Sequence, residues 1–315
     1  MFLICGEALF DLFGEAASGD SLTFDARIGG SPFNVAMGLA RLGEEAAFFG
    51  GISKDAFGEK LVQKLRDEGV SDRHILRTAY LTTLSVVQKD DHGQPAYTFY
   101  GADAADRMIT ADDLPVFSEP PMFLHIGSYT ALVDPVATAF KTLIGREKGN
   151  TLISFDPNIR PTVVPDMARW RSNTRSLVPL ADIIKVSDED LALIMPGEDY
   201  GEVARDWLSL GAGLVVVTRG QDGATAFTRN ARIDCPGVTV KVEDTVGAGD
   251  TFQAALLAGL KELGARDRDT LMALDEAKLA RLVGFAVKAA AVTCSRRGAD
   301  LPRRNELEKE WATLK

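Results

Sequence analysis

Short apolar runs rich in β-branched residues alternate along the chain with longer stretches in which apolar residues recur every three or four positions. The short runs predict buried strands, and the longer ones predict amphipathic helices. We expect strands at Phe2–Cys5, Ala46–Gly50, Phe123–Ile126, Leu152–Phe155, Ile183–Val186, Leu214–Thr218 and Ala224–Phe227. We expect helices at Asn34–Leu42, Phe57–Glu68, Val136–Gly145, Tyr200–Leu210, Phe252–Leu263 and Ala277–Thr293. This alternation predicts an α/β fold with a doubly wound, mostly parallel sheet and helices on both faces.

Two stretches depart from this alternation. Asp11–Ile28 and Leu84–Tyr100 have the pattern of hairpin strands, the second with Asp90-Asp91-His92-Gly93 as its turn. Extra strands early in such a fold often form a lid, which we expect at about 11–30 and 84–106. An exposed sheet of this size needs cover, and a second copy of the chain is the simplest cover, so we expect a homodimer through the lid.

The composition narrows the class of protein. With 315 residues, 46% of them hydrophobic, the chain can bury the core of a single domain over residues 1–315. Its net charge of −10 argues against nucleic-acid or anionic-membrane binding. Three cysteines without metal-type spacing and the absence of a signal-like start suggest a reducing, cytoplasmic location. No apolar run is long enough to predict a membrane span.

The segment Asp244–Phe252 carries the most informative chemistry. A β-rich run, Cys235–Val242, precedes it, and an apolar helical pattern follows. Gly247 and Gly249 allow the backbone to approach a ligand closely. We expect the amides of residues 248–250 to be unpaired at a helix start, which attracts anions. Taken alone, the segment is more often a tight turn capped by an aspartate.

Asp250 gives this segment a second possible role. A carboxylate beside an anion site is unexpected unless a substrate hydroxyl loses its proton there. Because a helix N-terminus stabilises negative charge, we expect the pKa of Asp250 to be depressed and the residue to be a modest base.

A second glycine-rich segment lies near the N-terminus. Gly29 and Gly30 precede Asn34 and a helical pattern, and Asn34 offers both a donor and an acceptor to a sugar diol. Upstream, Asp11 follows the first predicted strand, where residues of open parallel sheets line the ligand crevice. For the glycine-rich segment, a turn with a helix cap is an equally good interpretation. For Asp11, a solvated turn residue is an equally good interpretation.

Together, Gly29-Gly30…Asn34 and Asp244-Thr245-Val246-Gly247-Ala248-Gly249-Asp250 resemble the ribokinase-type (PfkB) carbohydrate kinases, from about Leu3 to Leu301. The segments 6–11, 97–107, 156–160 and 181–187 resemble most the bacterial fructokinase branch. The resemblance implies a ribokinase-like three-layer fold. It also implies that Asp250 is the base and that Gly247, Ala248 and Gly249 form the anion hole. It implies sugar contacts from Asp11, Gly29, Gly30, Asn34, Phe99, Tyr100, Arg107, Arg160 and Asp250.

The same resemblance implies the binding of ATP and Mg²⁺. The nucleotide contacts would come from Lys185, Thr218, Gly220, Gly223, Gly247, Ala248, Gly249, Cys294 and Gly298. Asp244 and the carbonyl of Val246 match part of a monovalent-cation site found in potassium-activated members. The element Asn-x-x-Glu, which supports Mg²⁺ through water, is replaced here by Ser187 and Asp190. Glu189 or Asp188 is an alternative partner, and a simple acidic helix start is an equally good interpretation.

The predicted activity is transfer of the γ-phosphoryl group of ATP to a primary sugar hydroxyl, foremost D-fructose to fructose 6-phosphate. Kinases of 2-keto-3-deoxygluconate, ribose or a nucleoside are the alternatives. Some relatives carry an arginine directly after the aromatic pair, where this chain has Gly101, but Arg160 remains available to a sugar-acid carboxylate.

Other classes fit the sequence less well. A nicotinamide dehydrogenase would need a third glycine where this chain has Phe252, and no Walker-type G-x-x-x-x-G-K-[ST] occurs. The intact Asp250 argues against a non-catalytic sugar-sensing relative.

Overall fold

A mostly parallel sheet forms the centre of the molecule, in a computed structural model that describes residues 1–14, 20–89 and 95–314. Its eight strands lie in the order β14 (Arg232–Cys235), β13 (Ala224–Phe227), β12 (Leu214–Thr218), β11 (Ile183–Ser187), β10 (Leu152–Asp156), β9 (Phe123–Gly127), β1 (Phe2–Cys5) and β4 (Ala46–Phe49). Neighbours from β12 to β4 are parallel, whereas β13 and β14 pair antiparallel at one edge.

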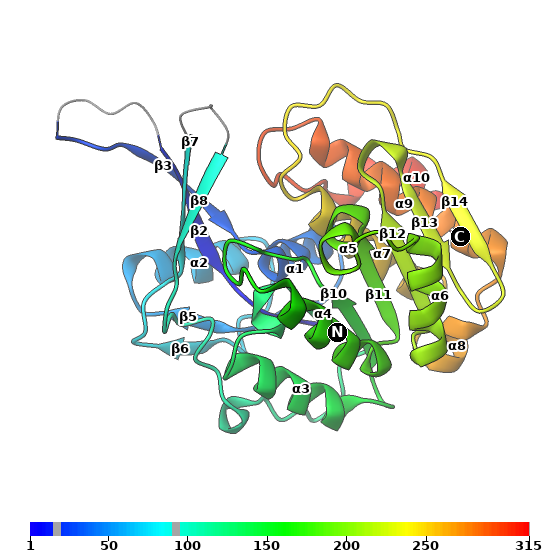
Figure 1. Cartoon of the computed structure of the whole chain (residues 1–315), viewed down its shortest axis with the longest axis horizontal. Helices are drawn as coiled ribbons and strands as arrows, with labels where there is room; N and C mark the ends of the chain where they lie inside the picture. Colours follow the sequence, from blue (N-terminus) through cyan, green and yellow to red (C-terminus); the bar gives the residue numbers. More distant parts are fainter. Residues whose placement is uncertain (15–19, 90–94, 315) are drawn as a thin grey trace.

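Helices cover both faces of this sheet (Figure 1). Side chains alternate along a strand, so Phe2 and Ile4 of β1 pack on one side and Leu3 and Cys5 on the other. The first side holds α1 (Ser31–Arg41), α7 (Ala248–Glu262) and α9 (Glu276–Cys294), and the second holds α3 (Val136–Glu147) and α6 (Tyr200–Leu210). Burial on both faces confirms the predicted three-layer α/β fold.

The remaining elements are shorter or lie at the edges. They are the helices α2 (Ala56–Asp67), α4 (Met167–Leu177), α5 (Asp188–Ile194), α8 (Arg268–Met272) and α10 (Glu308–Ala312), the paired strands β5 (Gly51–Ser53) and β6 (Leu76–Thr78), and 3₁₀ turns at Ala111–Asp113, Tyr129–Ala131, Val178–Leu180, Gly220–Asp222 and Arg304–Leu307.

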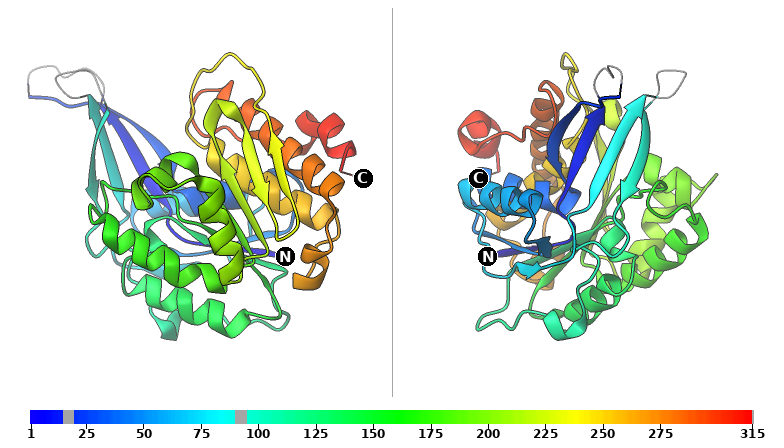
Figure 2. Two further views of the ribbon diagram at one scale, coloured as in Figure 1. Left: turned by 45° about the vertical axis from the view of Figure 1, so that its right-hand side comes forward. Right: turned by 90° about the vertical axis from the view of Figure 1, so that its left-hand side faces the viewer.

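A four-stranded sheet projects from the body beside the carboxyl end of the main sheet (Figures 1 and 2). Its order is β3 (Phe24–Gly29), β2 (Leu9–Gly14), β7 (Leu84–Lys89) and β8 (Pro95–Tyr100). Strands β2 and β3, and strands β7 and β8, are antiparallel pairs, as the sequence pattern predicts. The turn expected at Asp90–Gly93 lies outside the described residues.

One local interpretation, the β-rich run before Asp244, is wrong. The run Cys235–Val242 is not a strand, because β14 ends at Cys235 and the chain then runs to α7 without strand pairing. Pro236 lacks an amide hydrogen, so it cannot continue the ladder at this edge. Asp11 follows β1 in the chain and lies within β2, paired with Arg27 of β3, in the stretch predicted to form hairpin strands.

A close crossing of α1 and α7 brings the two glycine-containing motifs together. Gly38 of α1 faces Ala254 of α7, and a Cβ atom on Gly38 would lie 2.8 Å from the Cβ of Ala254. The absence of a side chain therefore lets the two helices touch, which sets their N-terminal residues against each other. None of the helices in the described ranges has the length and apolar character needed to span a bilayer.

Candidate active site

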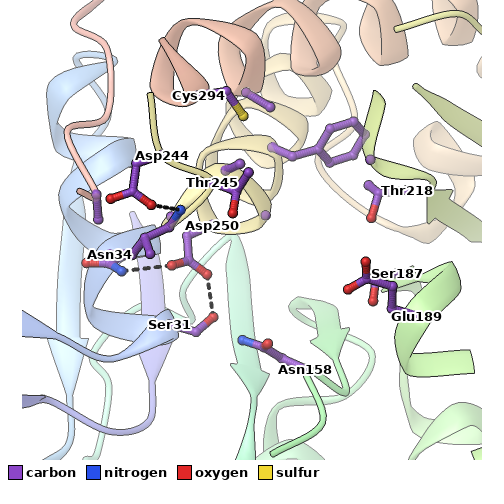
Figure 3. Close-up of a pocket in the computed structure, with 18 of the residues that line it drawn as sticks. Ser31, Asn34, Asn158, Ser187, Glu189, Thr218, Asp244, Thr245, Asp250 and Cys294 are labelled. Carbon is purple, nitrogen blue, oxygen red and sulfur yellow. Dashed lines mark hydrogen bonds between the residues drawn. The ribbon is translucent and has the colours of Figure 1, made fainter. Parts of the chain in front are cut away.

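A cleft of about 1150 Å³ lies between the projecting sheet and the carboxyl ends of the main strands. It brings together residues of β2 and β3, the ends of β11 and β12, and the starts of α1 and α7. Figure 3 shows Ser31, Asn34, Asp244 and Asp250 on one side of this cleft and Ser187 and Thr218 on the other. Open α/β sheets bind ligands at this edge, so the topology supports the predicted location.

The start of α7 is left without a side-chain cap. Gly247 adopts left-handed backbone angles, φ 79° and ψ 0°, and no side chain accepts a hydrogen bond at this position. Among the described residues, the amides of Gly249 and Asp250 have no partner. The amide of Ala248, expected to be free, instead donates to the carbonyl of Thr245 at 3.2 Å, because the turn is tight. Two amide donors thus remain for an anion.

Asp250 is held by two donors from α1. Its Oδ1 accepts from Ser31 Oγ at 2.6 Å, and its Oδ2 accepts from Asn34 Nδ2 at 2.8 Å (Figure 3). Burial raises the pKa of Asp250 despite these bonds and the nearby charges of Lys185 and Arg160. The predicted depression of this pKa is therefore wrong: loss of hydration outweighs the helix start. The result is a stronger base than expected, fixed in orientation.

The sugar-side residues predicted from the sequence mostly line the cleft. They are Asp11, Gly29, Gly30, Asn34, Phe99 and Arg160. Burial raises the pKa of Asp11 against the effects of Ser85 and Arg160. Tyr100 and Arg107 are not among the lining residues: Tyr100 is 62% exposed, and Arg107 lies 5.0 Å over the ring of Tyr129. A sugar role for these two stays a prediction.

The nucleotide-side residues also line the cleft, namely Lys185, Thr218, Gly220, Gly223, Cys294 and Gly298. Asp244 closes this end, since its two oxygens accept from the amides of Val246 at 3.1 Å and Gly298 at 2.9 Å. The segment after α9 is thereby tied to the loop before α7. These bonds occupy Asp244, and its role at a monovalent cation stays a prediction.

The expected metal element forms the start of α5. Ser187 caps this helix by accepting from the amide of Asp190 at 3.0 Å, and Asp190 Oδ1 accepts from the amide of Ile159 at 3.0 Å. Asp188, Glu189 and Asp190 all line the cleft. Within the described ranges, no group of three or more His, Cys, Asp or Glu side chains is arranged to hold a metal.

Several cleft residues were not singled out from the sequence. Ser31 lies between Gly30 and Asn34 in the sequence, yet its bond to Asp250 spans 219 positions and follows from the helix crossing. Glu7 is buried below the sugar side, where it accepts from Thr130 at 2.9 Å, and burial raises its pKa to about 7. Ser128 and Asn158 line the cleft with positive φ, 57° and 41°.

Comparison with known proteins agrees with this geometry. The model of the pfkB family of carbohydrate kinases matches residues 3–306. The chain belongs to this family. A fructokinase of Rhizobium leguminosarum bv. trifolii is 38% identical over 279 residues, covering 89% of this chain and 85% of the relative.

Two solved structures of family members are close in shape. The fructokinase of Xylella fastidiosa with bound ATP has a TM-score of 0.89 and 27% identity, covering 98% of this chain and 97% of its own. A double mutant of the Vibrio cholerae O395 fructokinase, with fructose, ADP and potassium ion bound, has a TM-score of 0.84 and 30% identity, covering 100% of this chain and 98% of its own. For this carbohydrate kinase, the agreement confirms the family resemblance and the fold predicted from the sequence.

Proposed function

We propose that this chain is an ATP-dependent fructokinase, which transfers the γ-phosphoryl group of ATP to the primary 6-hydroxyl of D-fructose. One observation carries the proposal: the carboxylate of Asp250 lies beside two free amides of an uncapped helix start, inside the cleft. Such a site can take a proton from an alcohol while it neutralises a neighbouring anion. The fructokinase relatives supply the substrate class.

In this proposal the chain acts mainly by positioning its reactants, as phosphoryl transfer requires. Asp11, Gly29, Gly30 and Asn34 hold the sugar, and its 6-hydroxyl donates to Asp250. The amides of Gly249 and Asp250 bind the phosphoryl oxygens, and the Thr218–Gly223 loop and Gly298 flank the nucleotide. Phe99 and Tyr100 belong to the projecting sheet, which acts as the lid of a single kinase domain.

Mg²⁺ accompanies ATP in this proposal, since hard cations of this size prefer phosphate and water oxygens. The carboxylates at the start of α5 would support its water shell, with Asp190 partly committed to Ile159. Asp244 and the Val246 carbonyl remain candidates for K⁺, the ion bound in the Vibrio structure. The proposal also keeps a homodimer through the lid and a cytoplasmic location, where ATP is available.

A second candidate substrate is 2-keto-3-deoxygluconate. The observation that favours it is Arg160, whose guanidinium lies in the cleft and donates to the carbonyl of Ile159. A fixed cation here can pair with a sugar-acid carboxylate. Fructose has no carboxylate. When fructose is bound, the positive charge of Arg160 would therefore be balanced only by the surrounding aspartates.

Steady-state ATP consumption with D-fructose, 2-keto-3-deoxygluconate, ribose and adenosine tests the proposal. We expect the highest kcat/KM with fructose, and ³¹P NMR of the product to show a phosphomonoester at C6. A preference for the sugar acid would establish the second candidate. If none of the four acceptors stimulates ATP consumption, the proposed function is wrong.

A further inference from the structure

A buried ion pair lies at the back of the cleft, on two neighbouring parallel strands. Lys185 is the third residue of β11 and Asp156 the last of β10, and Lys185 Nζ lies 2.8 Å from Asp156 Oδ2. Their side chains are 5% and 2% exposed. Removing two charges from water is costly, so a buried pair of this kind is weak evidence for a contribution to stability.

The ammonium lies against the uncapped start of α7. A Cβ atom on Gly249 would be 3.1 Å from Lys185 Nζ, which places the charge beside the free amide of that residue. A helix start is itself electropositive, so an ammonium there is repelled unless an anion compensates both. Asp250 compensates in part, but its two oxygens already accept short hydrogen bonds from Ser31 and Asn34.

The donors of Lys185 are not exhausted by Asp156. An ammonium has three donors, and one is used in the pair. Burial opposes its charge, yet the negative charge of Asp156, with those of Asp190 and Asp250, raises the pKa of Lys185 above its ordinary value. The Lys185 ammonium therefore lies beside the start of α7 with donors to spare, and such an arrangement can bind an anion.

We propose that Lys185 is a catalytic residue of phosphoryl transfer, whose ammonium, fixed by Asp156, binds a non-bridging oxygen of the transferred group in the transition state. The inference rests on the proposed kinase function and adds a residue to its mechanism. The sugar hydroxyl gives its proton to Asp250, and its oxygen bonds to the γ-phosphorus. The bond from that phosphorus to the bridging oxygen breaks, and its electron pair stays on ADP. Lys185 remains protonated throughout.

The neighbouring metal element explains why a fixed cation is useful here. Ser187 stands where the family has an asparagine, and Asp190, in the place of the glutamate, is bound to the amide of Ile159. Support for Mg²⁺ is thus altered, whereas the charge that develops on the phosphoryl oxygens still needs neutralising. A preorganised ammonium supplies this without reorganisation cost.

The first test is Lys185→Met, with Lys241→Met as matched control. Lys241 pairs with Glu243 at 2.7 Å, is 89% exposed and lies outside the cleft lining, so its loss should leave kcat unchanged. For Lys185→Met we expect kcat to fall about 10²–10³-fold, as for loss of one preorganised donor. The KM for the sugar should stay within about threefold, a change worth under 1 kcal/mol.

The double variant Lys185→Met/Asp156→Asn separates catalysis from folding. Lys185→Met alone leaves a buried unpaired carboxylate, which lowers the melting temperature. Neutralising Asp156 should restore the melting temperature but not kcat. If kcat recovers together with stability, Lys185 is only structural and the proposal is overturned.

Calorimetry gives a readout that does not depend on turnover. ADP, Mg²⁺ and the best acceptor sugar are titrated with and without aluminium fluoride, which stands in for the transferred phosphoryl group. We expect aluminium fluoride to tighten the binding of ADP to the wild type. In the double variant we expect near-normal ADP affinity without aluminium fluoride and no tightening when it is added. An unchanged gain overturns the proposal. Inactivity toward fructose, with another sugar phosphorylated, would instead refute only the substrate assignment.

Discussion

Two helices begin at this cleft, and their starts are built in opposite ways. Helix α7 starts at a left-handed Gly247 without a side-chain cap, and its first turn has two free amides. Helix α5 starts at Ser187, whose hydroxyl caps the helix, and its first turn carries Asp188, Glu189 and Asp190. In Figure 3, Asp250 of α7 and Ser187 and Glu189 of α5 lie on opposite sides of the cleft.

The difference shows that a helix start is an anion site only if its sequence leaves it open. At α5, Ser187 accepts from the amide of Asp190 and Asp188 accepts from the amide of Glu189, while the three carboxylates of the first turn oppose the helix dipole. At α7, Gly247 leaves two amides free, and Asp250, the one carboxylate of the first turn, only partly offsets the positive charge of Lys185 and the helix start. A phosphoryl group is therefore expected at α7, and the water shell of a cation near α5.

Asp250→Asn is the change expected to have the largest effect on this comparison. The amide keeps the shape of the side chain and can still accept from Ser31, but it cannot take a proton. We expect kcat to fall by about 10²–10⁴-fold or somewhat more, with fructose and ATP still bound. Steady-state kinetics and calorimetry measure both quantities.

Near-normal turnover of Asp250→Asn would refute the base assignment. The matched control is Asp275→Asn, because Asp275 caps α9, also at a helix start, but lies outside the cleft lining. It should change stability only.

Gly247→Ala tests whether the open start of α7 is required. A side chain at φ 79° is strained, and its Cβ would lie 2.7 Å from the Cβ of Ala299. We expect a stability loss of about 1–3 kcal/mol and an ATP KM raised about tenfold, the change that 1.4 kcal/mol of lost binding gives. Urea unfolding and kinetics measure these effects.

Gly264→Ala is the matched control for backbone strain. Gly264 follows α7 with φ 88°, and a Cβ there meets no atom within 4 Å. It should cost about 1 kcal/mol of stability and leave the ATP KM unchanged. If both variants weaken ATP alike, the start of α7 is not the phosphate site.

The sequence predicted the fold wherever one periodicity dominates. Strands β12 and β13 and helix α6 begin and end at the expected residues, because their apolar residues are uniformly buried or fall on one face. Helix α4 was missed because its polar sequence buries little besides Trp170, Thr174 and Leu177. The valines after Pro236 alternate like a strand, but Val238 and Val242 are 43% and 59% exposed beside the cleft.

The site was predictable as a set of motifs but not as a set of contacts. The two glycine motifs identified both starts that meet at Asp250. The bonds from Ser31 and Asn34 to Asp250 depend on the crossing of α1 and α7, which no local pattern specifies. The pKa of Asp250 was predicted in the wrong direction, because the helix start is visible in the sequence and the burial is not.

Ser31→Ala is expected to change the pH dependence more than the maximal rate. The Ser31 hydroxyl stabilises the ionised form of Asp250 and lowers a pKa that burial raises. Its loss therefore raises this pKa, so the active carboxylate is lost at higher pH as the solution is acidified. The acid limb of kcat/KM should shift upward, with activity falling more at pH 5 than at pH 8. Ser176→Ala, at an exposed serine, is the control. If Ser31→Ala leaves the acid limb unchanged, the ionisation of Asp250 does not set that limb.

The smallest effect is expected at the closed helix start. Ser187→Ala removes the cap of α5, which is worth about 1 kcal/mol. Asp199→Ala is the matched variant, because Asp199 caps α6 by accepting from the amides of Gly201 and Glu202 and lies outside the cleft lining. Both should lose similar stability in urea unfolding.

Only Ser187→Ala frees the Asp190 amide toward the cleft and alters the acidic first turn. Only this variant should therefore raise the Mg²⁺ concentration needed for half-maximal rate. An equal Mg²⁺ requirement in the two variants would show that the start of α5 serves the fold alone.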